Sequence, residues 1–215
     1  MNKLLKLLSI LQLTKEQPCT GYLASGIRIG ETASLAEHHY TASLNSYFIL
    51  QRVKKAGGII NEGRVMLMLM VHDLPELFGG DIAAPLNRKY PDLRIYKDKI
   101  GERAIEMMSE FLASDEADEF KKLHKELEEF STDEAVVAKI FDQMDHQFFL
   151  EHLNYHSKYN HDKEDYRVSF ISNHVSKLTE KIKDEKTKKV MTDFLQEFIN
   201  NYFNKGFQGF NFLME

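Results

Sequence analysis

The chain has 215 residues, of which 43% are hydrophobic and 28% charged, and its formal net charge is -5. These values are ordinary for a compact soluble protein, and the length is sufficient to bury a core. The negative charge argues against a surface for long nucleic acids, but it leaves open a local basic pocket for a small anion. The single cysteine, Cys19, excludes an internal disulfide and favours a reducing cytoplasm.

The first predicted element is an amphipathic helix that packs on the core. Lys6 interrupts its apolar run and residues 14–18 do not resemble a cleavage site, so we favour a helix over a secretory signal. No other stretch approaches the ~20 consecutive apolar residues of a membrane span, so no membrane is expected as a partner. The apolar residues recur at helical spacing: Leu4, Leu7, Leu8 and Leu11.

An irregular segment over residues 14–32 separates this helix from two more, which are predicted at about 32–55 and 61–71. The second of these is apolar on all sides, which is typical of a helix that runs through the centre of a domain. Pro75 follows four residues after its end, so we expect the helix to kink or fray there.

The rest of the chain is also predicted to be helical. After a proline-containing loop, helices are expected at about 93–113, 115–130, 132–158, 165–183 and 186–204, with a polar turn at 158–164. Strand-like alternation is scarce, so the predicted fold class is all-α. We expect residues 1–160 to form the core domain and residues 161–215 to form a helical extension on the same domain. Its aromatic end, residues 206–213, would pack on the core or on a partner.

The pair His72-Asp73 is the first candidate for chemistry, because it stands at the end of the very apolar helix. A buried carboxylate is costly unless it is paired or bound to a cation. Taken alone, the pair also fits a histidine that a neighbouring carboxylate orders. His38 and Asp142, on two other predicted helices, complete a set of two imidazoles and two carboxylates. Such a set suits one divalent ion among Mn, Fe, Co, Ni and Zn, and not a thiolate-rich structural zinc site.

The order of these residues resembles a known family. His38, then His72-Asp73, then Asp142 is similar to the H…HD…D signature of the HD-domain phosphohydrolase superfamily. The resemblance implies a helical bundle around a mononuclear divalent-metal site. Four strings within residues 15–155 look like motifs of the HD-domain 5′-deoxynucleotidases: Ser34-Leu-Ala-Glu-His38, His72-Asp-Leu-Pro-Glu76, Gly80-Asp-Ile82 and Phe141-Asp-Gln143. Those enzymes release phosphate from deoxynucleoside 5′-monophosphates, usually as homodimers, so a nucleotide substrate and a homodimer are implied here.

Carried over residue by residue, the resemblance assigns four metal ligands: His38, His72, Asp73 and Asp142. It makes Glu76 and Asp81 the catalytic acids, with Glu76 near the attacking water or the leaving oxygen and Asp81 orienting the water or the substrate. Four basic residues are candidates for binding the substrate phosphate, although each also fits a solvated surface cation: Arg28, Arg88, Lys89 and Lys97.

The sequence also departs from the resemblance at two places. Cys19 stands where those enzymes commonly carry an arginine that helps to fix the substrate, and Ala33 replaces an expected glutamate, for which Glu31 is a possible substitute. These changes leave the metal ligands intact and put the substrate in doubt. A triphosphohydrolase, a phosphodiesterase of the same superfamily, and a catalytically silent nucleotide-binding protein therefore stay open as alternatives.

Overall fold

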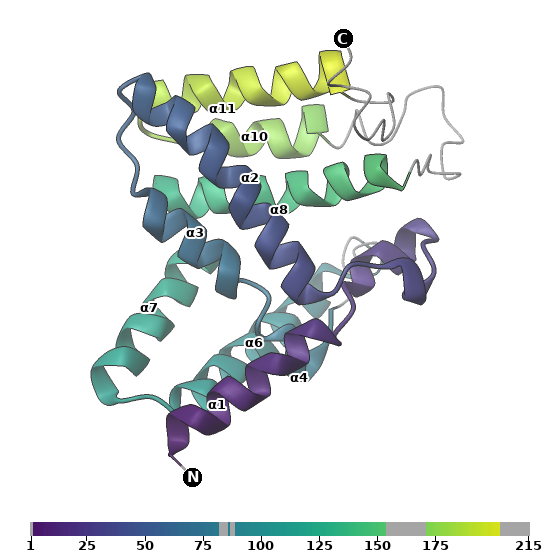
Figure 1. Ribbon diagram of the computed structural model, residues 1–215, viewed down its shortest axis with the longest axis vertical. Helices are drawn as coiled ribbons and strands as arrows, with labels where there is room; N and C mark the ends of the chain where they lie inside the picture. Colours follow the sequence, from purple (N-terminus) through teal and green to yellow (C-terminus); the bar gives the residue numbers. More distant parts are fainter. Residues whose placement is uncertain (1, 82–85, 87–88, 154–170, 203–215) are drawn as a thin grey trace. The chain divides into compact units, whose positions relative to one another are not determined.

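The computed structural model describes all residues except 1, 82–85, 87–88, 154–170 and 203–215 (Figure 1). Within that described part the chain is helical and has no strand; one isolated antiparallel bridge joins Pro18 and Ser34. The predicted all-α class is therefore confirmed.

The chain divides into two compact units, Met1–Tyr40 with Met70–Glu129, and Thr41–Leu69 with Phe130–Glu215. Two helices, α2 (Leu35–Lys55) and α3 (Glu62–Val71), contribute residues to both units. The division into residues 1–160 and 161–215 stays a prediction.

The remaining helices of the first unit are α1 (Lys3–Leu11), η1 (Gln12–Lys15), η2 (Thr20–Ser25), η3 (Ile29–Glu31), α4 (Glu76–Gly79), η4 (Pro91–Leu93), α6 (Arg94–Ser109) and α7 (Ser114–Glu129). The predicted first helix is present, and Figure 1 shows it alongside α6. Leu7 of α1 packs in a buried cluster with Leu74, Ile105 and Met108, and Leu11 lies against this cluster.

The predicted apolar face of α1 is only partly buried. Leu4 and Leu8 were expected to pack on the core with Leu7 and Leu11, but they are 41% and 47% exposed. The reason is geometric: the buried cluster covers the side of α1 that carries Leu7 and Leu11, and the apolar stripe is wider than that side.

The second unit is built from the remainder of α2 and α3 with α8 (Asp133–His152), η5 (Ile171–Val175), α10 (Ser176–Thr179), α11 (Glu185–Glu197) and η6 (Phe198–Tyr202). Figure 1 shows α8, α10 and α11 side by side, with α2 crossing in front of α8 and α10. Thr132 caps α8, because its Oγ1 accepts a hydrogen bond of 3.2 Å from the amide of Ala135. The predicted turn at 158–164 and the aromatic end at 206–213 lie outside the described residues.

The expected break near Pro75 is also present. Helix α3 ends at Val71, and α4 begins at Glu76, directly after the proline. The four residues between them form turns in which Leu74 N donates to Val71 O at 3.2 Å and Glu76 N donates to Asp73 O at 2.9 Å. In the ranges that the structure describes, no helix combines the length and the apolar character needed to cross a membrane.

Candidate metal centre

His38 is held by the first turn of α2, whose start is fixed by a reciprocal cap. The Ser34 amide donates to Glu37 Oε2 at 2.7 Å, and the Glu37 amide donates back to Ser34 Oγ at 3.3 Å. This is the capping-box arrangement, which satisfies two amides that would otherwise lack helical partners. The amide of His38 then donates to Ser34 O at 3.0 Å, so the position of the histidine follows directly from the cap.

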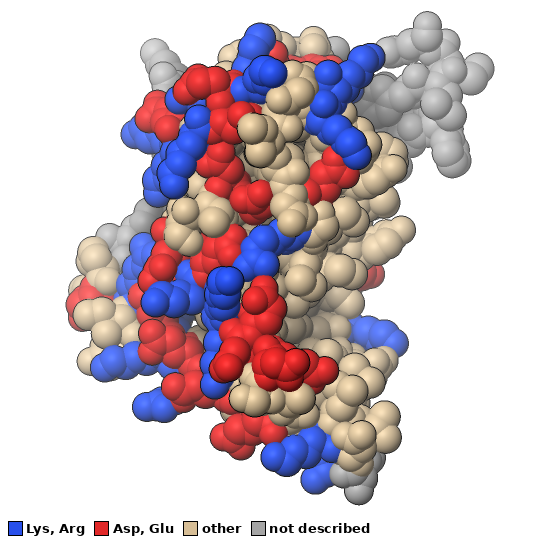
Figure 2. Space-filling view, turned by 90° about the vertical axis from the view of Figure 1, so that its left-hand side faces the viewer, with Lys and Arg blue, Asp and Glu red and all other residues tan. Residues whose placement is uncertain are grey.

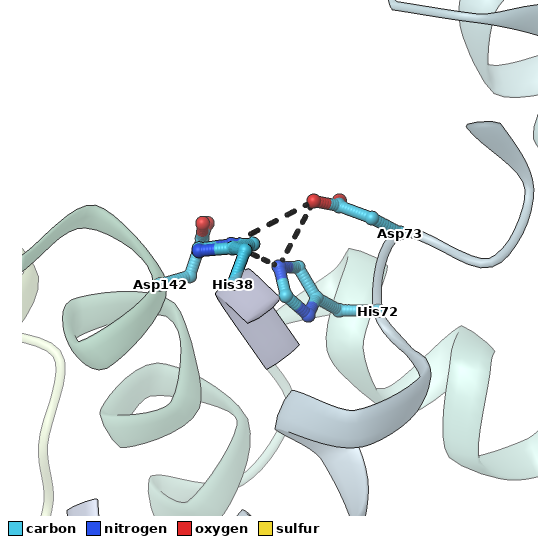
Figure 3. Close-up of side chains that lie close together, drawn as sticks. All are labelled: His38, His72, Asp73 and Asp142. Atoms are coloured by element: carbon cyan, nitrogen blue, oxygen red, sulfur yellow. Dashed lines mark hydrogen bonds and ion pairs between the residues drawn. The ribbon is translucent and has the colours of Figure 1, made fainter. Parts of the chain in front are cut away.

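His72 and Asp73 follow the last residue of α3, and the turn there solves a geometric problem. Adjacent residues of a regular helix point about 100° apart, so two of them rarely reach one ion. Because α3 has ended, the backbone is free to direct both side chains to one place, with His72 Nε2 only 3.1 Å from Asp73 Oδ2. Figure 3 shows the side chains of His38, His72 and Asp73 pointing toward one another.

The ligand atoms of these three residues lie at coordinating distances. His38 Nε2 lies 3.2 Å from His72 Nε2 and 3.8 Å from Asp73 Oδ2. Together with the 3.1 Å between His72 and Asp73, these distances form a triangle whose corners are all about 2.0 Å from one common point, close to the ~2.0–2.1 Å of Zn–N bonds. The residues therefore fit a first-row divalent ion.

The three side chains are also largely removed from water. His38 is 6% exposed, His72 10% and Asp73 28%. His39 is buried beside them, with its ring centroid 4.9 Å from that of His72. Without a metal, the Nε2 of one imidazole can donate a hydrogen bond to the Nε2 of the other across the 3.2 Å gap. A bound cation would instead be coordinated by the lone pairs of both Nε2 atoms.

Asp142, the fourth predicted ligand, belongs to α8 of the second unit and is also labelled in Figure 3. Its side chain is 14% exposed. Lys139 Nζ donates to Asp142 Oδ2 at 2.5 Å, and Gln143 Nε2 donates to the same oxygen at 2.9 Å. The sequence interpretation missed Lys139, although its i, i+3 spacing from Asp142 on a predicted helix was a usable signal.

The two predicted catalytic acids, Glu76 and Asp81, share one lysine in the first unit. Lys97 of α6 donates a hydrogen bond to Asp81 Oδ1 and lies 3.9 Å from Glu76 Oε1. The side chain of Glu76 is 14% exposed and that of Asp81 is 21% exposed. The structure thus brings together three residues that the sequence interpretation had named separately.

The environment of this cluster changes its protonation. Burial raises the pKa of Glu76 from 4.5 to about 8, assisted by the charges of Asp73 and Asp81 and opposed by Lys97 and His72. Burial lowers the pKa of Lys97, but the charge of Asp81 and the hydrogen bond to it raise this pKa further than burial lowers it. The cluster therefore pairs a carboxyl group that tends to hold its proton with a firmly charged lysine.

The other predicted phosphate-binding residues are not seen in contact with Glu76 or Asp81 in the part of the chain that the structure describes. Arg28 is exposed at the start of η3, and Lys89 lies over the ring of Tyr90, 5.4 Å from its centroid. Arg88 lies outside the described residues. On the face drawn in Figure 2, Lys and Arg side chains are interspersed with Asp and Glu and do not gather in a field of one sign. Of the three candidates that the structure describes, Lys97 is the one placed against the predicted catalytic acids.

A sequence model described as the HD domain matches residues 12–201 of this chain. The chain belongs to the HD-domain family. The resemblance is therefore confirmed as far as the HD domain, and the 5′-deoxynucleotidase subtype stays a prediction. A comparison with curated proteins finds no match.

Solved structures share the HD-domain fold of this chain. The PH0347 protein from Pyrococcus horikoshii OT3 is 23% identical, with 90% of this chain and 96% of that chain covered and a TM-score of 0.62. A predicted metal-dependent phosphohydrolase from Magnetospirillum magnetotacticum MS-1 is 17% identical over 92% and 91% of the two chains, also with a TM-score of 0.62. A conserved hypothetical protein from Pyrococcus furiosus is 21% identical over 90% and 99%, with a TM-score of 0.62. At these identities the likeness shows the fold.

Proposed function

We propose that this HD-domain protein is a metal-dependent phosphohydrolase that releases phosphate from nucleoside 5′-monophosphates, and from deoxynucleotides in particular. The proposal is carried by one observation: the ligand atoms of His38, His72 and Asp73 surround a common point at coordinating distance. The same unit holds Glu76 and Asp81, the carboxyl groups that phosphoryl transfer needs. The name of the Magnetospirillum relative agrees with this class of reaction.

We further propose Asp142 as the fourth ligand. Its place after the His72-Asp73 pair fits the order of the signature, and the family match covers it. The two donors on Oδ2, Lys139 and Gln143, hold the carboxylate in a fixed orientation, as groups behind metal ligands commonly do. Two imidazoles and two carboxylates leave positions for water and a phosphate oxygen on a six-coordinate ion.

The chemistry then divides between the ion and the chain. A bound divalent ion polarises a phosphoryl oxygen and lowers the pKa of a bound water. Glu76, whose burial favours its neutral form, can give a proton to the leaving 5′ oxygen. Lys97 orients the Asp81 carboxylate and supplies positive charge for the phosphate, and Arg28, Arg88 and Lys89 are further candidates for that contact.

The test is a screen of nucleoside phosphates with the purified protein, supplied in turn with Mn, Co, Fe, Ni and Zn and scored by released phosphate. We expect turnover of nucleoside 5′-monophosphates that a chelator stops and Mn or Co restores. Product analysis separates the alternatives, because tripolyphosphate indicates a triphosphohydrolase and a linear nucleotide from a cyclic one indicates a phosphodiesterase. Tight nucleotide binding without turnover under every metal would contradict the proposal and favour a silent binding protein.

A further inference from the structure

The helix α2 exposes a row of large apolar side chains. Four of them share one face at one- and two-turn spacings, and we call them the α2 stripe: Tyr40, Leu44, Tyr47 and Phe48. Their exposed fractions are 63%, 40%, 42% and 60%. The opposite face of the helix is buried, since Ala42, Ser46 and Leu50 are 0% exposed. In Figure 1, α2 lies in front of α8 and α10, on the side that faces the viewer.

The α2 stripe has the composition of the centre of a protein interface. The rings of Tyr47 and Phe48 pack edge to face, with centroids 5.3 Å apart and planes inclined by 74°. Rings that already support each other lose little freedom on binding, and aromatic residues dominate interface centres. The four side chains offer roughly half of the ~800 Å² that each partner contributes to a standard interface. Leu67 of α3, 45% exposed, adds apolar area.

The charges on α2 indicate what this stripe pairs with. From His38 to Gln51 the helix carries no Asp, Glu, Lys or Arg. Glu37, three residues before Tyr40, and Lys55, seven residues after Phe48, are both exposed on the stripe's face. The first turn of α2 is therefore acidic and its last turn basic, so the side chains at each end attract those at the complementary end of another such helix. The helix macrodipole has the opposite polarity and only reduces this attraction.

This arrangement complements itself. When two copies of α2 meet antiparallel across a two-fold axis, the uncharged middles face each other and the acidic start of each copy lies beside the basic end of the other. A parallel pair aligns like charges, and an anionic lipid surface meets Glu37 as well as Lys55. We propose that the α2 stripe is the interface through which two copies of this chain pair, with their α2 helices antiparallel.

The first test is the oligomeric state of the full chain, measured by sedimentation equilibrium with and without Mn. We expect a dimer, and we expect Phe48→Glu to raise its dissociation constant by about 30-fold or more, as for a residue at an interface centre. The matched control is Ile59→Glu, because Ile59 is 80% exposed in the loop between α2 and α3 and is not part of the stripe. A monomeric wild type, or a dimer that Phe48→Glu leaves intact, would overturn the proposal.

The second test concerns orientation. Lys55→Glu and Glu37→Lys should each weaken self-association, because each places like charges together at both ends of an antiparallel pair. An equimolar mixture of the two variants should form a heterodimer in which every end is complementary again. Either variant associating as strongly as the wild type would contradict antiparallel pairing, because in a parallel pair like charges already meet at both ends. A mixture that associates no better than either variant alone would contradict pairing through these ends. Thermal unfolding of both variants checks folding, since Glu37 also takes part in the cap with Ser34. The homodimer stays a prediction, and the α2 stripe is the surface proposed for it.

Discussion

His38 Nε2 and His72 Nε2 face each other at a distance of 3.2 Å, although 34 positions separate the two residues. Two ligands bound at about 2.1 Å to one ion lie about 3.0 Å apart at a right angle and about 3.4 Å apart at a tetrahedral angle. The observed separation falls between these values. The backbone therefore places the two imidazoles as one metal would require.

Removing a ligand should remove the metal. We expect His72→Ala and Asp73→Ala each to weaken Mn or Co binding by more than the ~10–100-fold that loss of a hydrogen-bonding partner behind a ligand costs. Glu76→Gln should retain the ion and lose turnover, because Glu76 is assigned to proton transfer and not to coordination. Calorimetric titration and metal analysis of the purified variants measure this. Equal metal loss in all three variants would refute the division of roles.

Removing an orienting partner should have a smaller effect. Gln143→Leu deletes the amide that donates to Asp142 Oδ2 at 2.9 Å, so metal affinity should fall by about 10-fold if Asp142 is a ligand. The matched control is Gln196→Leu on α11, which deletes an amide that donates to Asn200 Oδ1 at 3.0 Å. We expect that control to bind metal like the wild type. Identical affinities for the two variants would argue against Asp142 as a ligand.

The metal-free protein should become less stable as the pH rises, because the folded state holds a proton on Glu76 that it must then lose. The folded-state pKa of about 8 lies above the ordinary 4.5, so between these values the folded state binds more protons than the unfolded state. The free energy of unfolding therefore falls with increasing pH, by at most about 1.4 kcal/mol per pH unit from this group.

Glu76→Gln tests this effect. The variant should match the wild type near pH 4.5 and exceed it in stability near pH 8, because glutamine has no proton to lose. Chemical denaturation with a chelator present, at several pH values, measures the difference. Glu106→Gln, at a side chain that is 52% exposed on α6, is the control and should not change the slope. A wild-type slope that Glu76→Gln leaves unchanged would show that another group is responsible.

Packing between α4 and α6 should be sensitive at Gly79. A Cβ added there would clash with Ile100 Cγ2, so either the Ile100 side chain or the backbone of one helix has to shift. We expect Gly79→Ala to reduce the free energy of unfolding by about 1–3 kcal/mol. Gly30→Ala is the control, because a Cβ there meets nothing within 4 Å. Equal stability of the two variants would show that the contact relaxes without cost.

The sequence interpretation succeeded where a pattern is local. The helices predicted at about 32–55 and 61–71 are present as Leu35–Lys55 and Glu62–Val71, and the break near Pro75 followed from proline chemistry. The approach of His38 to His72 came from the resemblance, since periodicity places a residue on a helix face and does not say which faces meet.

Other features depended on tertiary contacts that local patterns do not encode. The exposure of Leu4 and Leu8 depends on how much of α1 its neighbours cover. The joining of Glu76 and Asp81 through Lys97 requires the chain to return along α6, and the pairing of Lys139 with Asp142 depends on the rotamers of both side chains. The spacing of residues along the chain is compatible with several tertiary contacts in each case and does not select the one observed.

The cap formed by Ser34 and Glu37 couples helix fraying to cation affinity. His38 belongs to the turn that this cap closes, so opening that turn would carry an imidazole away from its neighbours. By thermodynamic linkage, an ion that binds only the closed turn lowers the equilibrium constant for opening by the factor 1 + L/Kd, where L is the concentration of free ion. Amide hydrogen exchange at the start of α2 should therefore report occupancy of the site without any substrate.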